Sequence, residues 1–245
     1  MKKKKILKRV LIGIVAVVAV LAIAFFAYTK DYYRASDLAN SSLVSDEEVN
    51  VEKLDDGTYV FKPTNETNTG IIFYPGGKVE YSAYAPLLHE LASRGVLCVL
   101  VKMPANLAIL DTNAANGIKE DFPEVENWYL SGHSLGGACA SMYLAKNGND
   151  YKGLILLAAY SNKDLKNSNL DVLCIYGSND GVMKMDSYNE NKKNLPEDAK
   201  EVVIEGGIHS YFGSYGLQKG DGEPTITNED QINSTVDAIT EFVFD

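Results

Sequence analysis

The sequence predicts an α/β fold in which a mostly parallel sheet is covered by helices on both faces. Short apolar runs recur between residues 70 and 207, and segments with helical periodicity separate them. Continuous apolar runs are typical of strands that are buried on both faces, and their alternation with helices is typical of parallel sheets. Glycines end several of these runs, at the edge where such sheets gather their functional residues.

The individual elements follow in order along the chain. Residues 48–63 predict a hairpin that turns at Asp56-Gly57. The apolar runs predict strands at residues 70–76, 96–103, 127–132, 152–160, 171–177 and 200–207. Helical character is predicted for residues 80–95, 106–120, 135–146, 182–194 and 228–244.

An N-terminal apolar segment stands apart from this pattern. Residues 1–9 carry six basic side chains, and residues 10–28 carry no charge. A helix over residues 10–28 is about 28 Å long, which matches the hydrocarbon core of a bilayer. We expect a transmembrane signal-anchor in the cytoplasmic membrane, with a basic cytoplasmic start and the rest of the chain outside. The alternatives are a cleaved signal peptide, with a poor site at residues 22–24, and a buried core helix.

The charge balance changes where this segment ends. Residues 1–30 hold seven of the 23 Lys and Arg residues and none of the 33 Asp and Glu residues, which leaves 16 basic against 33 acidic residues, a net charge of −17. Such a surface does not neutralise phosphates, so we expect no nucleic-acid partner. Residues 29–46 are polar and predict a tether, and residues 47–245 predict the folded domain.

Three cysteines lie in apolar stretches, at Cys98, Cys139 and Cys174. We expect all three to be small core residues rather than part of a disulfide framework. An exported domain without such a framework is compatible with a bacterial cell surface.

A serine lies between two glycines where a predicted strand meets a predicted helix. The sequence of residues 132–136 is Gly-His-Ser-Leu-Gly. In a strand–turn–helix context this pattern forms a nucleophile elbow, whose tight turn lifts the serine above the sheet. We expect Ser134 to be the nucleophile, with Gly132 and Gly136 leaving space for the turn. The alternative is a serine that only caps the helix.

A serine hydroxyl needs a base to take its proton. In sites built on such an elbow, the base is a histidine that follows the serine in the chain. His89 lies in the first predicted helix, and His133 lies within the elbow itself. His209 is the one histidine after the serine, in a glycine-rich loop just past the last strand, and is the candidate base.

The acid that orients this base is expected between Ser134 and His209, at the end of a strand. Asp180 meets both conditions, because it comes three residues after the glycine that closes strand 171–177. Asp186 and Glu205 are the less favoured candidates for this acid. The other aspartates of this stretch lie in linkers, at a strand start or on helices, at Asp150, Asp164, Asp171 and Asp198.

Acyl transfer also needs two N–H donors for the oxyanion. The residue after the nucleophile, Leu135, is expected to supply one. The glycine-rich loop after strand 70–76 is expected to supply the other, from the amide of Gly77 or Lys78. The alternative for these glycines is a plain turn.

The chain resembles the α/β-hydrolase family, in particular its small lidless bacterial members of dienelactone-hydrolase-like type. The resemblance covers residues 68–244 and is carried by YPGGKVEYSAYAPLLHELASRG, VKMPANLAIL, GHSLGG, YGSNDGV and GGIHSYFGSYG. It implies an α/β-hydrolase fold and acyl transfer to water by Ser134, His209 and Asp180, without a metal or cofactor. A cysteine nucleophile marks true dienelactone hydrolases, and this chain has Ser134 in its place.

The sequence says less about the substrate than about the type of reaction. Residues 161–170 are too few for a lid domain, which favours a small soluble ester or an extended polymer such as an esterified cell-wall glycan. A peptidase or amidase on the same triad is an alternative, as is a non-catalytic cell-surface binding protein. Several tyrosines are expected near the site, where they could stack on substrate rings, at Tyr81, Tyr84, Tyr160, Tyr211 and Tyr215.

Overall fold

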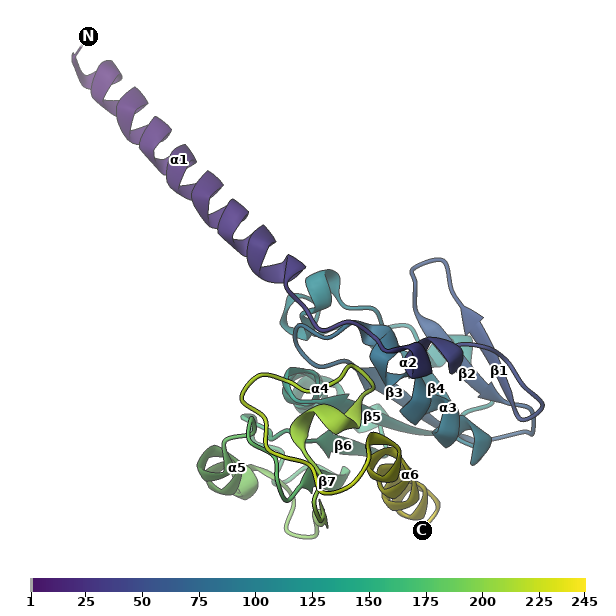
Figure 1. Cartoon of the computed structure of the whole chain (residues 1–245). Helices are drawn as coiled ribbons and strands as arrows, with labels where there is room; N and C mark the ends of the chain where they lie inside the picture. The colour runs from purple at the N-terminus through teal and green to yellow at the C-terminus, as the bar shows by residue number, and fades with distance from the viewer. Residues whose placement is uncertain (1) are drawn as a thin grey trace. The chain divides into compact units, whose positions relative to one another are not determined.

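The computed structural model describes residues 2–245, so Met1, the first residue of the predicted basic start at residues 1–9, lies outside the described residues. The chain divides into two compact units, the first ending at Tyr32 and the second covering Tyr33–Asp245. Figure 1 shows the course of the chain through both. All strands of the predicted α/β fold lie in the second unit.

Helix α1 makes up nearly all of the first unit. It covers Lys2–Lys30, and its segment Ile6–Lys30 is long and apolar enough to cross a membrane. None of the apolar window in this segment is buried, whereas the core helix of a soluble protein is mostly buried. An uncleaved anchor and an N-terminal signal sequence both have this length and composition, so the helix is a candidate for either.

Within the described residues, the second unit contains one eight-stranded sheet with the order β1-β2-β4-β3-β5-β6-β7-β8. Strands β3 to β8 are parallel to their neighbours among themselves, whereas β2 runs antiparallel to β1 and β4. The mostly parallel sheet and the N-terminal hairpin are thus confirmed. The strands are β1 Val49–Lys53, β2 Tyr59–Pro63, β3 Thr69–Tyr74, β4 Leu97–Leu100, β5 Asn127–His133, β6 Gly153–Leu157, β7 Asp171–Gly177 and β8 Lys200–Ile204.

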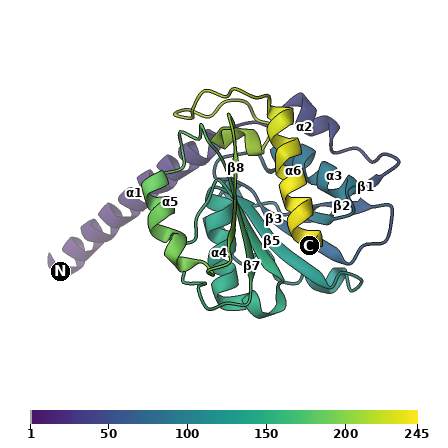
Figure 2. The same ribbon diagram turned by 90° about the horizontal axis from the view of Figure 1, so that it is seen from below.

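Helices cover both faces of this sheet, as Figure 2 shows from below. Helices α3 and α6 pack on one face, and α4 and α5 pack on the other, so that each face has its own apolar core. Strand β5 contributes Tyr129 to the first core and Trp128 to the second, because successive side chains of a strand alternate between faces. The helix bounds are α3 Ala85–Ser93, α4 Leu135–Asn147, α5 Met185–Asn191 and α6 Asn228–Phe244.

The three cysteines lie in these cores as predicted. Cys98, Cys139 and Cys174 are all buried, and none is paired. Burial raises the pKa of each thiol, which keeps it protonated and unreactive.

Part of the segment predicted as a tether, residues 29–46, belongs to the folded domain. Residues from Tyr33 onwards belong to the second unit, where Asp37–Ser41 form helix α2 and Ala39 is fully buried. Ser36 caps this helix by accepting the Ala39 N–H at 3.2 Å, and its own N–H donates to the Ser214 carbonyl at 2.8 Å. The partners of this segment lie far along the chain, so its local sequence shows no periodicity that would reveal them.

The helical character predicted for residues 106–120 takes the form of short 3₁₀ turns. These lie at Pro104–Asn106, Ala108–Leu110 and Lys119–Asp121. Leu107 and Asp111, inside the predicted stretch, have φ angles of −132° and −147°, which an α-helix does not accept. The chain therefore cannot form one continuous helix over this stretch.

Candidate active site

Ser134 occupies the turn between strand β5 and helix α4. Its φ of 51° and ψ of −119° are rarely adopted by residues other than glycine. Its N–H donates to the Leu157 carbonyl at 2.9 Å, at the end of the neighbouring strand β6. Its side chain makes no capping hydrogen bond to α4, so a helix cap does not account for the serine. The turn has the strained geometry expected of a nucleophile elbow.

Two glycines give this turn its space. A Cβ on Gly136 would lie 2.1 Å from the carbonyl oxygen of Tyr74, and a Cβ on Gly132 would lie 2.5 Å from the carbonyl carbon of Gly136. These neighbours are backbone atoms, which cannot rotate away as a side chain would. The end of β3, the elbow and the start of α4 therefore pack at a separation that only glycine permits.

Replacing Gly136 by alanine is expected to lower the free energy of unfolding by at least about 3 kcal/mol, or to prevent folding, because the new methyl group overlaps the Tyr74 carbonyl. Gly148 ends the same helix and is the matched control, since a Cβ there would meet Leu170 at 3.4 Å, an ordinary contact. Thermal unfolding followed by circular dichroism checks the pair. Similar melting temperatures for Gly136→Ala and Gly148→Ala would contradict the packing described here.

The candidate base and acid form a buried hydrogen-bonded pair. His209 Nδ1 lies 2.8 Å from Asp180 Oδ2, and the two side chains are 2% and 1% exposed. The other oxygen, Asp180 Oδ1, accepts the N–H groups of Val182 and Met183, each at 2.8 Å. Because a carboxylate only accepts, the neutral imidazole of His209 carries its proton on Nδ1 and a lone pair on Nε2. This is the tautomer that a general base requires.

The structure brings His209 beside the elbow without a hydrogen bond to Ser134. The ring centroid of His209 lies 4.5 Å from that of His133, the residue before Ser134. Among the residues that the structure describes, His209 Nε2 is buried and has no hydrogen-bond partner. Nucleophile–base contacts are often long before substrate binds, so this geometry is compatible with a Ser–His pair. His89 makes a separate contact, with its Nε2 at 3.4 Å from Asp46 Oδ2.

The two loops predicted to supply the oxyanion donors touch each other. A Cβ on Gly77 would lie 2.9 Å from Leu135 Cδ2. The Lys78 N–H donates to the Asn106 carbonyl at 2.8 Å, so this amide is already engaged. The prediction that the Lys78 amide could bind the oxyanion is thereby corrected. Its acceptor, Asn106, lies in a loop that no sequence pattern links to Lys78. The N–H groups of Gly77 and Leu135 have no acceptor within residues 2–245 and remain the candidates.

A buried tyrosine links the loop after β3 to the elbow. The Tyr84 hydroxyl accepts the Gly76 N–H at 3.0 Å and lies 2.8 Å from His133 Nδ1. Burial raises the pKa of Tyr84, while burial and then the neighbouring His209 lower the pKa of His133, so both groups are neutral. The hydroxyl thus bonds the Gly76 N–H on one side and the His133 ring on the other. Tyr84 therefore holds the two loops together, and its buried ring does not stack on substrate rings as the sequence suggested.

The sequence pattern does not single out Asp221, yet this residue joins the loops that carry the acid and the base. Gly181 follows Asp180 directly, and Ser210 follows His209, so the bonds of Asp221 fix both loops relative to each other. An aspartate between two glycines is too common in loops to have predicted this role. The carboxylate accepts four backbone N–H groups, those of Ser210 at 2.7 Å, Gly222 at 2.9 Å, His209 at 3.1 Å and Gly181 at 3.2 Å.

Substituting Asp221 by asparagine is expected to lower kcat by about 10- to 100-fold with little change in KM, because the Asp180–His209 pair shifts relative to Ser134. The amide nitrogen of the variant cannot accept a hydrogen bond, so at least one backbone N–H loses its partner. Glu223→Gln makes the same change of charge two residues away on an exposed side chain and is the control. An unchanged kcat in Asp221→Asn, with the fold intact, would contradict this positioning role.

Asp221 should also contribute to the pH dependence of stability. Its burial raises the pKa, but the N–H groups of Ser210, Gly181 and Gly222 outweigh this effect and hold the pKa below its usual value. A group with a lowered folded-state pKa stabilises the fold above its unfolded pKa, and that stability is lost as the pH falls through the folded value. Between about pH 7 and pH 3, urea unfolding should show a larger loss of stability in the wild type than in Asp221→Asn. Equal losses would refute this.

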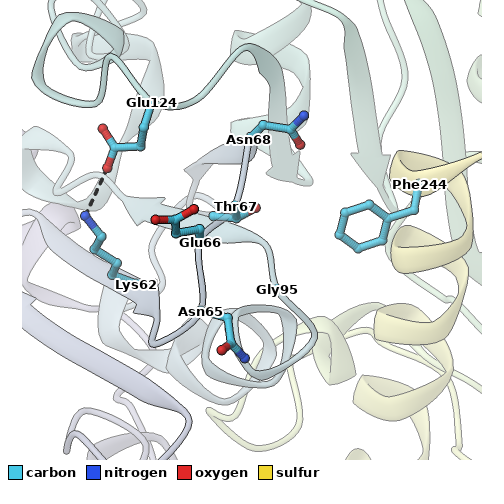
Figure 3. A pocket seen from close by; sticks show the side chains of 8 residues that line it. All are labelled: Lys62, Asn65, Glu66, Thr67, Asn68, Gly95, Glu124 and Phe244. Carbon is cyan, nitrogen blue, oxygen red and sulfur yellow. Dashed lines mark hydrogen bonds and ion pairs between the residues drawn. The ribbon is translucent and has the colours of Figure 1, made fainter.

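A cavity of about 820 Å³ lies at the opposite edge of the sheet from the elbow. Figure 3 shows its lining, in which Lys62 Nζ pairs with Glu124 Oε1 at 2.9 Å. Asn68 and Gly95 stand before strands β3 and β4, so the cavity lies at amino-terminal strand ends, whereas Ser134 follows the carboxyl end of β5. The cavity is therefore not part of the candidate active site.

Comparison with known families agrees with this architecture. Residues 70–233, more than half of the chain, match the profile of the alpha/beta hydrolase family. The chain belongs to this family. The sheet of this α/β hydrolase and the helices around it therefore confirm the predicted fold class. No curated protein matches the sequence.

Three solved structures show the same fold at low sequence identity. A predicted CIB-like hydrolase from Thermoplasma acidophilum is 17% identical, with a TM-score of 0.55 over 79% of this chain and 98% of its own. Est1E from Butyrivibrio proteoclasticus is 16% identical, with a TM-score of 0.57 over 81% and 98%. Carboxyl esterase 2 from the mycorrhizal fungus Tuber melanosporum is 13% identical, with a TM-score of 0.61 over 87% and 91%.

Proposed function

We propose that this α/β hydrolase is a serine hydrolase that cleaves a carboxylic ester through an acyl-enzyme. The observation that carries the proposal is the buried Asp180–His209 pair, which leaves His209 Nε2 with a free lone pair beside the elbow of Ser134. Membership of the hydrolase family supports the proposal, and one of the similar structures is a carboxyl esterase. In this assignment Ser134 is the nucleophile, His209 is the general base and Asp180 orients it.

Each half of the reaction moves one proton through His209. In the first half, Ser134 Oγ attacks the ester carbonyl carbon while His209 Nε2 takes the hydroxyl proton. The bond to the alcohol then breaks, and His209 gives the proton to the departing alkoxide. In the second half, water attacks the acyl-enzyme carbonyl and passes its proton to His209. That proton returns to Ser134 Oγ as the carboxylic acid leaves.

Two backbone amides are proposed to stabilise the oxyanion of each tetrahedral intermediate. The Leu135 N–H lies at the amino end of helix α4, where the helix dipole also favours negative charge. The Gly77 N–H lies on the loop that touches Leu135. Gly76 is bound to Tyr84 and Lys78 to Asn106, which holds Gly77 between two fixed neighbours.

The surroundings of the site favour a small or extended ester substrate. The loop between β6 and β7 contains no helix within the described residues, and its length leaves no room for a lid domain. These features fit a small lidless bacterial enzyme of dienelactone-hydrolase-like type with a serine nucleophile. We propose that residues 10–28 act as a signal-anchor and that the folded domain works outside the cytoplasmic membrane.

A matched series of chromogenic substrates tests the proposed activity. We would assay the full chain in detergent with p-nitrophenyl esters from acetate to octanoate and with p-nitroanilides of the same acyl groups. The expected result is hydrolysis of the esters, fastest for the short chains, with slower anilide cleavage. Faster anilide cleavage would indicate an amidase or peptidase instead. A folded protein that turns over neither series would favour a non-catalytic binding protein.

A further inference from the structure

Tyr33, the first residue of the folded unit, is hydrogen-bonded to the loop after β3. This loop lies at the catalytic edge, the edge of the sheet that carries the candidate active site. The Tyr33 N–H donates to the Lys78 carbonyl at 2.8 Å, and the Tyr33 carbonyl accepts the Glu80 N–H at 2.8 Å, which makes a parallel bridge to Val79. Lys78 comes directly after Gly77, the proposed oxyanion donor. The chain thus enters the folded unit beside the oxyanion loop.

A second loop of the site holds the same tyrosine. The Tyr33 hydroxyl accepts the Lys219 N–H at 3.0 Å, and its ring lies 5.7 Å from that of Tyr215. Both residues follow the short turn that carries His209, at His209–Phe212. Tyr33 is therefore fixed between the loop of the proposed oxyanion donor and the loop of the proposed base.

Only a short stretch of chain separates Tyr33 from the apolar segment, which ends at Tyr28. Five residues of fully extended chain span at most about 17 Å. This limit holds for every orientation that the two units can take. If residues 10–28 remain in the bilayer, Tyr33 therefore stays within that length of the membrane surface, and the two loops that bind Tyr33 are held near it.

The loops around Tyr33 also expose apolar side chains. Leu217, in the loop that binds the Tyr33 ring, is 61% exposed. Ile109 and Leu110 are each 49% exposed and follow Asn106, whose carbonyl binds the Lys78 N–H. Such side chains are stabilised in the interfacial layer of a bilayer, whereas the net charge of −17 on residues 31–245 opposes binding to anionic lipids.

We propose that the active site takes its ester from the surface of the bilayer that holds α1, on the head group of a lipid or lipid-linked chain. This inference rests on the proposed function, and it narrows the substrate from a soluble or distant wall ester to one within reach of the membrane. Water adds to the acyl carbon, the ester bond breaks, the acid leaves, and the alcohol stays on its lipid. The partner surface is an uncharged or zwitterionic bilayer.

The test compares one ester in two settings. The full chain is reconstituted in phosphatidylcholine vesicles that contain a phospholipid with an acetoxycoumarin on its head group, and free acetoxycoumarin is assayed in parallel. A rigid helical (EAAAK)₄ spacer inserted between Lys30 and Asp31 adds about 30 Å. The control carries the same spacer after Asp245. We expect the inserted spacer to lower turnover of the lipid-linked ester by about 10-fold, because the effective concentration of substrate falls.

The two esters separate the membrane-surface proposal from the proposed hydrolase function. The free ester should be cleaved equally by the wild type and both spacer forms. The membrane-surface proposal would be overturned if all three proteins cleaved the lipid-linked ester equally. It would also be overturned if the wild type cleaved the free ester but not the lipid-linked one. In both cases the proposed hydrolase activity would stand. Loss of both activities in the wild type would instead overturn the proposed function. As a second variant, Leu217→Asp should lower the lipid-linked to free turnover ratio relative to Val44→Asp, a control that is also exposed.

Discussion

Replacing Ser134 by alanine is expected to lower kcat for ester hydrolysis by at least about 10⁴-fold, because no other group can form the acyl-enzyme. Whatever rate remains should come from the oxyanion donors and from substrate binding, which the substitution leaves in place. Initial rates with p-nitrophenyl acetate check the prediction. The concentration of folded protein in each preparation has to be fixed by its unfolding transition.

Ser141→Ala is the matched control for this experiment. Ser141 lies on helix α4, directly after the elbow, and is fully buried. Its hydroxyl donates to the Ala138 carbonyl at 2.7 Å. Its removal should affect stability slightly and kcat hardly at all. Full activity in a folded Ser134→Ala variant would mean that the elbow does not carry the nucleophile.

Changing Asp180 to asparagine is expected to lower kcat by about 10⁴-fold with little effect on the fold. Asp180 Oδ1 is held by the N–H groups of Val182 and Met183, so the asparagine oxygen should keep that position. Its NH₂ group then faces His209 Nδ1 and donates to it. The ring is thereby forced into the tautomer with its proton on Nε2, where it cannot accept the Ser134 proton.

Asp186→Asn separates this effect from a general change of charge. Asp186, the reserve acid of the sequence, is exposed in the first turn of helix α5 and makes no contact with His209 among the described residues. The pH profile of kcat should be unchanged in this control. A drop in Asp186→Asn, or wild-type activity in Asp180→Asn, would show that the acid has been assigned to the wrong residue.

The parts of the fold that sequence predicts well are those that local physics determines. Buried parallel strands need apolar side chains on both faces, so β3 to β7 appear as apolar runs. The elbow is local too, since Gly132 and Gly136 serve a turn five residues long. Asp180 and His209 could be predicted because parallel strands bring their carboxyl ends to one edge of the sheet.

The parts that sequence does not predict depend on partners distant in the chain. Tyr33 is held by residues 78–80 and 219, so the segment around it looks like a tether until the fold is known. The Lys78 amide is engaged by Asn106, and Tyr84 by His133, through contacts that no spacing rule links. Asp221 is recognisable only once both loops that it joins are in place.

Covalent labelling of the nucleophile tests directly whether the chain is a serine hydrolase. The full chain would be treated with a fluorophosphonate, digested, and analysed by mass spectrometry to locate the adduct, with Ser134→Ala treated in parallel. We expect a single adduct on Ser134, within the segment that contains Gly-His-Ser-Leu-Gly, and none in the variant. A folded protein that stays unlabelled, or that carries the adduct on another residue, would contradict a serine hydrolase built on this elbow.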